Sequence, residues 1–381
     1  MSQAMATKAY FLKMVGASIC GLPIPSCPDD INIIKLYKLS VQNAVQGIFY
    51  LAVKDGKINF PEDLTKKLKA SYMTIMMREA SQEAEIELIR QDFSKQNLDF
   101  MFLKGTHLKA LYPLPEMRFM VDMDILLHES DLDSARDIML SHGFSLKMNS
   151  AKDIILIKEP CLTVELHKML FVEDYFMHDY FSAVWNRAEK YDGNEYKMSL
   201  NDLYVYTLAH LAEHYLSAGS CFRPMMDLFL MEKHHNTELD FEYINKQFEI
   251  LGILKFAQNI RLLYNCMFAD GEYNKDLEMM ENYIVLGPPV KNAEAASMAA
   301  TTKKSKLKIL FETAFPPFKH MKIRYPILKK LPFLLPLYWA IRIIQYTFTK
   351  DARLSKAREG LKNMDDNGTA IMQKIFEKSG F

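Results

Sequence analysis

The sequence lacks any Cys-x-x-Cys pair. Its five cysteines are scattered along 381 residues at Cys20, Cys27, Cys161, Cys221 and Cys266. Zinc sites built from such pairs are therefore excluded, and an odd, scattered set of thiols is not a disulfide framework. This cysteine usage favours reduced thiols in a cytoplasmic protein.

An excess of charge of one sign is also missing, because 47 basic residues balance 47 acidic ones. The chain contains no internal repeat and no low-complexity tract. Global charge therefore indicates no polyanionic partner, and the hydrophobic share of 49% is that of an ordinary globular protein. A chain of this length exceeds one hydrophobic core, so we expect two or three domains.

Helical periodicity dominates both ends of the chain. It extends over residues 31–96, where Pro61-Glu62-Asp63 gives a proline and two acids at the start of a long helix. It returns from residue 200 onwards, in segments 203–216, 225–232, 241–268 and 307–311. Glycine and proline near residue 287 indicate a break, which we expect to continue as a loop through residues 293–302.

The middle of the chain has a different pattern. Short apolar runs predict strands at residues 100–103, 121–127, 144–148, 154–158 and 162–167, with helices at 106–111 and 130–141. The sequence therefore predicts the α+β class, with a small mixed sheet flanked by helical segments. The expected parts are an N-terminal helical segment (1–97), an α/β domain (98–195), a C-terminal helical domain (196–350) and a basic helical tail (351–381).

Two aspartates interrupt one of the predicted strands. Asp122 and Asp124 are separated by one residue, and in an extended strand this spacing points both side chains to the same face. Two neighbouring anions repel each other unless a cation lies between them, so the pair predicts a divalent-cation site. The alternative is a solvated edge strand, which the flanking apolar residues Val121 and Ile125 disfavour. Phosphoryl or nucleotidyl transfer is the leading hypothesis.

A strand, a glycine-containing turn, a helix and then a strand with Asp-x-Asp form the core pattern of the nucleotidyltransferase superfamily. More closely, the chain resembles the family of uncharacterised nucleotidyltransferases over roughly residues 100–342. The residues that carry this resemblance are Leu103-Lys104-Gly105, Tyr112-Pro113, Arg118, Val121 to Leu127, Gly143-Phe144, Val164-Glu165-Leu166-His167, His210 with His214, Arg223 with Asp227, and Arg324 to Leu337.

The resemblance implies a metal-dependent reaction. In such folds a third carboxylate on a neighbouring strand completes the metal site, and Glu165 is the candidate beside Asp122 and Asp124. These three catalytic carboxylates would hold two magnesium ions, with manganese as an alternative. The donor would be a nucleoside triphosphate. For Glu165 the alternative is an ion pair with a nearby basic residue.

The resemblance also implies a nucleotide site at the Lys104-Gly105-Thr106 turn. Gly105 would let the backbone approach the phosphates, Thr106 would donate its hydroxyl, and the helix that begins there would offer free N–H groups. Lys104 and Arg118 would be the cations nearest the triphosphate. Alternatively, Lys104 caps a helix or pairs with an acid, and Arg118 is a structural partner of Asp122.

Several polar residues have weaker claims to a function. His210 and His214 belong to a His-x-x-Glu-His sequence, but no third zinc ligand is marked, so packing or contact with nucleotide or acceptor is the better interpretation. Arg223 and Asp227 have the spacing of an intrahelical pair, with contact to the acceptor or the nucleotide as the alternative. His167 is either a partner of the metal ligands or a structural residue at a strand end.

Positive charge is concentrated near the C-terminus. Residues 303–362 contain fifteen lysines and arginines against three acids. The same region holds an apolar stretch with Tyr338 and Trp339, which Pro332 and Pro336 interrupt. We expect either a helix packed on the domain or peripheral contact with a membrane surface, at its inner face in a cytoplasmic protein.

The sequence thus predicts an enzyme that transfers a nucleoside monophosphate from a triphosphate to a hydroxyl-bearing acceptor. A small-molecule acceptor is favoured over nucleic acid, because the lysines are not interleaved with a nucleic-acid-reading motif. The alternatives are a non-catalytic nucleotide-binding or membrane-docked scaffold, and a toxin-like transferase acting on RNA or protein.

Overall fold

The computed structural model describes residues 2–219, 221–269, 271–302, 315–316, 318, 321–322, 325–348 and 366–381. Its described residues form two compact units. The first lies within residues 1–212 and 220–286 and includes Gly380, whereas the second lies within residues 213–219 and 287–379 and includes Phe381. The boundaries predicted at residues 97, 195 and 350 stay predictions.

Four helices open the first unit: α1 (Gln3–Ile19), α2 (Ile33–Gln42), α3 (Gln46–Lys54) and α4 (Glu62–Lys95). The predicted start of the long helix is confirmed, because Pro61 caps α4 and the acids Glu62 and Asp63 occupy its first turn. Acids there interact favourably with the unpaired N–H groups of the helix end.

A seven-stranded mixed sheet follows. Its strands are β1 (Phe100–Phe102), β2 (Met123–Leu127), β3 (Ser145–Asn149), β4 (Asp153–Lys158), β5 (Leu162–His167), β6 (Glu189–Asp192) and β7 (Glu195–Lys197). The order is β3-β4-β5-β2-β1-β7-β6, and β2 is antiparallel to β1 but parallel to β5. The predicted α+β class is confirmed. The sequence did not predict β6 and β7, which are short and consist mostly of charged residues, so they lack an apolar run.

Short helical elements connect the strands. They are α5 (Gly105–Leu108), η1 (Lys109–Leu111), η2 (Pro115–Met117), η3 (Glu129–Asp131), α6 (Leu132–Ser141), α7 (His178–Ser182) and η4 (Val184–Arg187). Helix α6 ends before Gly143, whose φ of 87° lies in the left-handed region that glycine tolerates.

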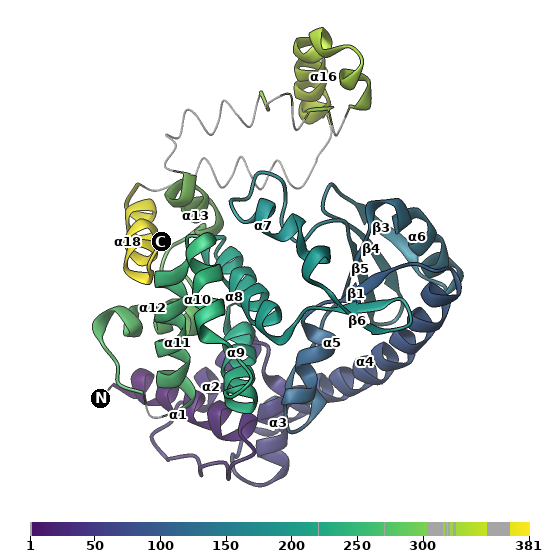
Figure 1. Cartoon of the computed structure of the whole chain (residues 1–381). Coiled ribbons are helices and arrows are strands. Elements are labelled where there is room, and N and C mark those ends of the chain that lie inside the picture. Colours follow the sequence, from purple (N-terminus) through teal and green to yellow (C-terminus); the bar gives the residue numbers. More distant parts are fainter. Residues whose placement is uncertain are drawn as a thin grey trace. The chain divides into compact units, whose positions relative to one another are not determined.

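One face of the sheet is covered by α4 and α6 (Figure 1). Alternate residues of the strands are buried against these helices, among them Met123 and Ile125 of β2 and Val164 and Leu166 of β5. Because side chains alternate along a strand, the residues between them point to the opposite face. The packing of one face therefore fixes which polar side chains gather on the other.

Helices make up the rest of the described chain: α8 (Leu200–Leu216), α9 (Phe222–His235), α10 (Phe241–Ile250), α11 (Leu254–Phe268), α12 (Lys275–Leu286), α13 (Ala293–Thr302), η5 (Pro326–Lys329), η6 (Pro332–Leu334), α16 (Leu335–Phe348) and α18 (Asp366–Ser379). The prediction of a loop at residues 293–302 is wrong, because this segment forms α13. The segment is rich in alanine, which has the highest helix propensity. The helix expected at 307–311 lies outside the described residues.

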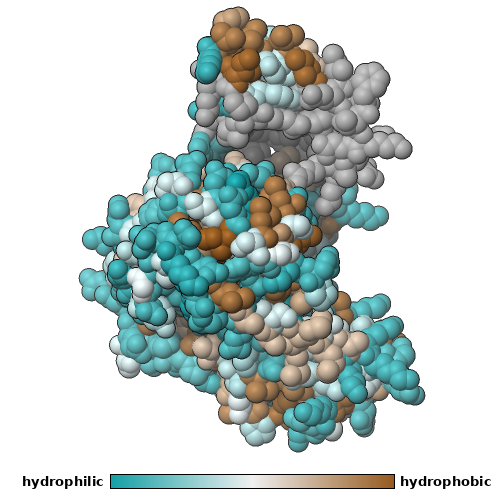
Figure 2. Space-filling model, turned by 90° about the vertical axis from the view of Figure 1, so that its right-hand side faces the viewer, coloured by the Kyte–Doolittle hydropathy of each residue, from teal (hydrophilic) through white to brown (hydrophobic). Residues whose placement is uncertain are grey.

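The membrane prediction concerns the second unit. None of the described helices is both long and apolar enough to cross a bilayer. Around α16, at the top of Figure 2, apolar side chains gather on the surface, and Phe333 is 73% and Leu337 53% exposed. Trp339 is half-buried instead, and its indole N–H donates to the Pro316 carbonyl at 2.9 Å. Most of the predicted basic residues, including Arg324, lie outside the described part of the chain.

Lipid contact through this segment stays a prediction, which flotation with phosphatidylserine-containing liposomes tests. We expect the protein to float with these vesicles and Phe333→Ser to reduce the floating fraction, because an exposed aromatic ring adds apolar area to the interface. The matched control is Phe176→Ser, which removes an aromatic ring with 57% exposure from the first unit. Absence of floating protein, or equal loss in both variants, would contradict the prediction.

Candidate functional site

Two carboxylates lie side by side on the face of the sheet that α4 and α6 leave uncovered. In the parallel pairing of β2 with β5, Asp124 is directly opposite Glu165. Residues opposite each other on neighbouring strands have adjacent side chains on the same face. The register alone therefore brings together two acids that are 41 positions apart in the sequence.

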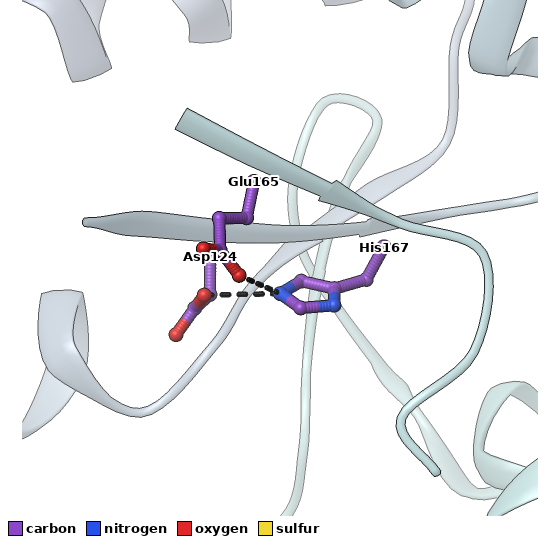
Figure 3. Close-up of side chains that lie close together, drawn as sticks. All are labelled: Asp124, Glu165 and His167. Carbon is purple, nitrogen blue, oxygen red and sulfur yellow. Dashed lines mark hydrogen bonds and ion pairs between the residues drawn. The ribbon is translucent and has the colours of Figure 1, made fainter. Parts of the chain in front are cut away.

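His167 joins them, two residues beyond Glu165 on the same face of β5 (Figure 3). Its Nε2 lies 2.9 Å from Oδ1 of Asp124 and 3.6 Å from Oε2 of Glu165. One ligand atom from each of the three residues lies within 4.8 Å of the others. The side chains of both acids are little exposed, at 23% for Asp124 and 22% for Glu165.

Burial and mutual repulsion shift the protonation of these acids. Burial raises the pKa of Glu165 to about 7, and the charges of Asp124 and Asp122 add to the effect. Burial would also raise the pKa of Asp124, but the hydrogen bond and charge of His167 outweigh it and lower this pKa below its usual range. The acids of the site thus repel one another, and a cation between them would relieve this repulsion.

The second ring nitrogen of His167 shows which role the imidazole plays. Nδ1 is buried, and no described residue is a hydrogen-bond partner for it. A metal-bound histidine usually donates its other N–H to an acceptor, which is missing here. We infer that Nε2 donates to the Asp124 carboxylate, so that His167 positions this group.

Asp122 lies beside this group but not in it. Asp122 lies one residue before β2 begins. The alternation of side chains along the strand therefore does not require it to share a face with Asp124. The pKa of Asp122 is raised overall. Burial and the charge of Asp124 raise it by more than the charges of Arg223 and Lys104 lower it. Of the three predicted ligands, the structure brings Asp124 and Glu165 together and places Asp122 within electrostatic reach.

The Lys104-Gly105-Thr106 turn follows β1, next to β2 in the sheet. Lys104 has a φ of 26°, which is strained for a residue with a side chain, and its Nζ lies 4.8 Å from the ring centroid of Tyr206. A side chain at position 105 would collide with the sulfur of Met120, so packing is the first reason for Gly105. The hydroxyl of Thr106 is buried without a described hydrogen-bond partner.

Arg118 is held by Asp227 rather than by Asp122. Its Nε and Nη2 each donate to the Asp227 carboxylate at 2.7 Å, and the Tyr112 hydroxyl donates to the same group at 2.8 Å. The remaining nitrogen, Nη1, is buried without a described partner and lies about 3.1 Å from where a Cβ at Gly105 would be. Arg118 thus directs one unused donor at the turn.

Arg223 and Asp227, which we expected to pair along one helix, make their hydrogen bonds to other partners, although the charge of Asp227 still acts on Arg223. Asp227 makes its hydrogen bonds to Arg118 and Tyr112, and Nη1 of Arg223 donates to the Phe119 carbonyl at 2.6 Å. Both side chains of α9 therefore bind the segment that connects α5 to β2. Spacing along one helix could not reveal these partners, because they are more than 100 residues away in the sequence.

His210 and His214 lie one turn apart on α8 and are half-buried. Among the described residues, the group with the geometry of a cation site contains neither of them. Their predicted contact with nucleotide or acceptor stays a prediction.

Comparison with known proteins agrees with this geometry. A family model described as uncharacterised nucleotidyltransferase matches residues 29–269, which is more than half of the chain. The chain belongs to this family. No curated protein and no solved structure is significantly similar to it. The match includes all the residues that form the site, from Lys104 to Asp227.

The raised pKa of Glu165 predicts how stability depends on pH. The folded protein binds the proton more tightly than the unfolded chain, so stability falls as pH rises from about 4.5 towards 7. We expect Glu165→Gln to raise the melting temperature of cation-free protein at pH 8, with a smaller gain at pH 5. Thermal unfolding in a chelator measures this difference.

The matched control for this measurement is Glu83→Gln, which changes an exposed acid on α4. We expect no pH-dependent gain from it. Magnesium should stabilise the wild type more than Glu165→Gln, because the ion needs the carboxylate. If Glu165→Gln is no more stable than the wild type at pH 8, the electrostatic description of the site is wrong.

The buried ion pair gives a second prediction. Replacing Asp227 by leucine leaves Arg118 charged and unpaired in the interior, which costs about 3–5 kcal/mol of unfolding free energy. Replacing both residues, as Arg118→Met with Asp227→Leu, should cost less than the single change. Urea denaturation measures both values. The control pair is Arg136 with Asp133 on α6, where the aspartate is 82% exposed.

Removal of the exposed control pair should change stability by less than about 1 kcal/mol. If the double variant at Arg118 and Asp227 is as unstable as the single variant, the loss of unfolding free energy does not come from leaving a buried charge unpaired.

Proposed function

We propose that the protein is a divalent-cation-dependent nucleotidyltransferase. It would transfer a nucleoside monophosphate from a triphosphate, ATP being our first choice, to a hydroxyl group of a small acceptor. The observation that carries the proposal is the pairing of Asp124 with Glu165 on adjacent parallel strands, under electrostatic conditions that favour a cation. Family membership supports the general class of reaction.

The two carboxylates have the ligand chemistry that magnesium prefers, with manganese as the alternative. Asp124 and Glu165 would hold the ion, and Asp122 is the candidate for a third carboxylate. A bound ion supplies neutralising charge for the triphosphate and for the departing pyrophosphate. His167 keeps one oxygen of Asp124 in a hydrogen bond and so fixes the rotation of that carboxylate.

The turn supplies positive charge and donors for the phosphates. The charge of Lys104 counteracts the raised pKa of Asp122 and helps to lower the pKa of Asp124, so its ammonium group is within electrostatic reach of both. Thr106 and Arg118 each keep a buried donor without a described partner beside this turn. Desolvated groups of this kind are costly unless a ligand completes their hydrogen bonds. A triphosphate would satisfy them.

We also propose that the protein is cytoplasmic. All five cysteines are free thiols, which is expected in the reducing cytoplasm.

Two rival interpretations of the function remain. The protein could be a scaffold that binds nucleotide without catalysis, or a toxin-like transferase that acts on RNA or protein. Analysis of the reaction products separates them.

Pyrophosphate release from ATP and magnesium, with a pool of small hydroxylated metabolites as acceptors, tests the activity. We expect Asp124→Asn to lower the rate by at least about 100-fold, because a cation ligand is lost while the fold persists. Asp133→Asn, which changes an exposed acid on α6, should keep the wild-type rate. Circular dichroism checks the fold of both variants.

Pyrophosphate release that survives Asp124→Asn, or that needs no divalent cation, would contradict the proposal. ATP binding without pyrophosphate release in every acceptor pool would favour the scaffold. Nucleotide label transferred to RNA or protein would favour the toxin-like reaction.

A further inference from the structure

Lys104 lines a cavity that neither Asp124 nor Glu165 lines. It has a volume of about 420 Å³ and is lined by residues of β1, β6 and β7, of α5, and of α8 and α9. Its apolar wall includes Phe102, Leu108, Leu203 and Met231. Volumes of this size are typical of sites for small organic molecules and far too small for a folded macromolecule.

The cavity adjoins the proposed nucleotide site through two neighbouring residues. Leu103 and Lys104 both line the cavity, and the backbone N–H of Leu103 donates to the carbonyl of Asp124 at 3.0 Å. A molecule in the cavity would therefore lie next to the reacting phosphates, which is the position that an acceptor needs.

The charges around the cavity favour an anionic group on the ligand. Two ammonium groups line it, those of Lys104 and Lys197, with the imidazoles of His107 and His235. The single lining carboxylate is that of Glu189, which lies opposite Lys197 in the β6–β7 pairing. Nζ of Lys197 lies 4.9 Å from the ring centroid of Tyr191, and no ion pair joins it to a described carboxylate. Burial lowers the pKa of His107, so this imidazole is neutral and adds no charge.

We propose that this cavity is the acceptor site, and that it binds a small molecule with an apolar body, one anionic group and a free hydroxyl. The identification as acceptor rests on the proposed nucleotidyl transfer, whereas the ligand class rests on the cavity alone. The acceptor's hydroxyl oxygen forms a bond to the α-phosphorus as the bond from that phosphorus to the bridging oxygen breaks. The hydroxyl proton passes to solvent, and pyrophosphate leaves.

Two fluorescent probes with the same rings separate the apolar and anionic parts of this proposal. Anilinonaphthalene sulfonate carries the anionic group, and phenylnaphthylamine lacks it. We expect both to bind the wild-type protein, with the sulfonate about tenfold tighter, which is the size of one charge-assisted contact. Fluorescence titration without nucleotide gives both dissociation constants.

Three variants locate the binding. Leu203→Trp places a larger ring in the cavity and should weaken both probes at least tenfold. Leu262→Trp is the matched control, because Leu262 is 56% exposed on α11 and does not line the cavity. Lys197→Met keeps the cavity open and should remove the preference for the sulfonate.

The design separates this proposal from the proposed function. We expect Leu203→Trp to keep binding of ATP with magnesium, measured by calorimetry, and Asp124→Asn to lose it while keeping both probes. If Leu203→Trp is folded and binds both probes as the wild type does, or if Lys197→Met keeps the preference for the sulfonate, the cavity proposal is overturned and the nucleotide site stands. If Asp124→Asn binds ATP normally while the probe results hold, the nucleotidyl-transfer proposal fails and the cavity remains a binding site.

Should Leu203→Trp fail to fold, Lys197→Met decides alone, because its result does not depend on filling the cavity.

Discussion

The pairing of β2 with β5 is the constraint on which the site depends. One face of these strands is packed against α4 and α6, and a shift of one residue would turn every apolar side chain away from that core. The register that buries Val164 and Leu166 therefore also places Glu165 opposite Asp124. Core packing thus holds two carboxyl groups side by side, and the charge of Asp124 contributes to the raised pKa of Glu165.

The second constraint is the ion pair between Arg118 and Asp227. It links α9 to the segment that leads into β2, and together with Tyr112 it satisfies a carboxylate that is 2% exposed. Because two of its three nitrogens are fixed, the guanidinium can direct only the third at the Gly105 turn. Helix α9 thus positions the guanidinium group of Arg118, and α8 and α9 line the cavity beside Lys104.

The sequence predicts the parts of the fold that have strong local signals. The long helix after Pro61, the strands that carry Asp124 and Glu165 and the α+β class all follow from periodicity and capping residues. The β6–β7 hairpin and the helix at 293–302 were missed because the first lacks an apolar pattern and the second lacks one dominant face. The partners of Arg118 and Arg223 depend on contacts between distant elements, which no local pattern encodes.

The central claim is that Asp124 and Glu165 share one cation. Anomalous diffraction from crystals soaked in manganese and a non-hydrolysable ATP analogue tests it most directly. The account predicts an anomalous peak in contact with both carboxylates and with phosphate oxygens, and His167 still bonded to Asp124 through Nε2. A manganese ion bound elsewhere in the protein, or a nucleotide that binds away from the Gly105 turn, would contradict it.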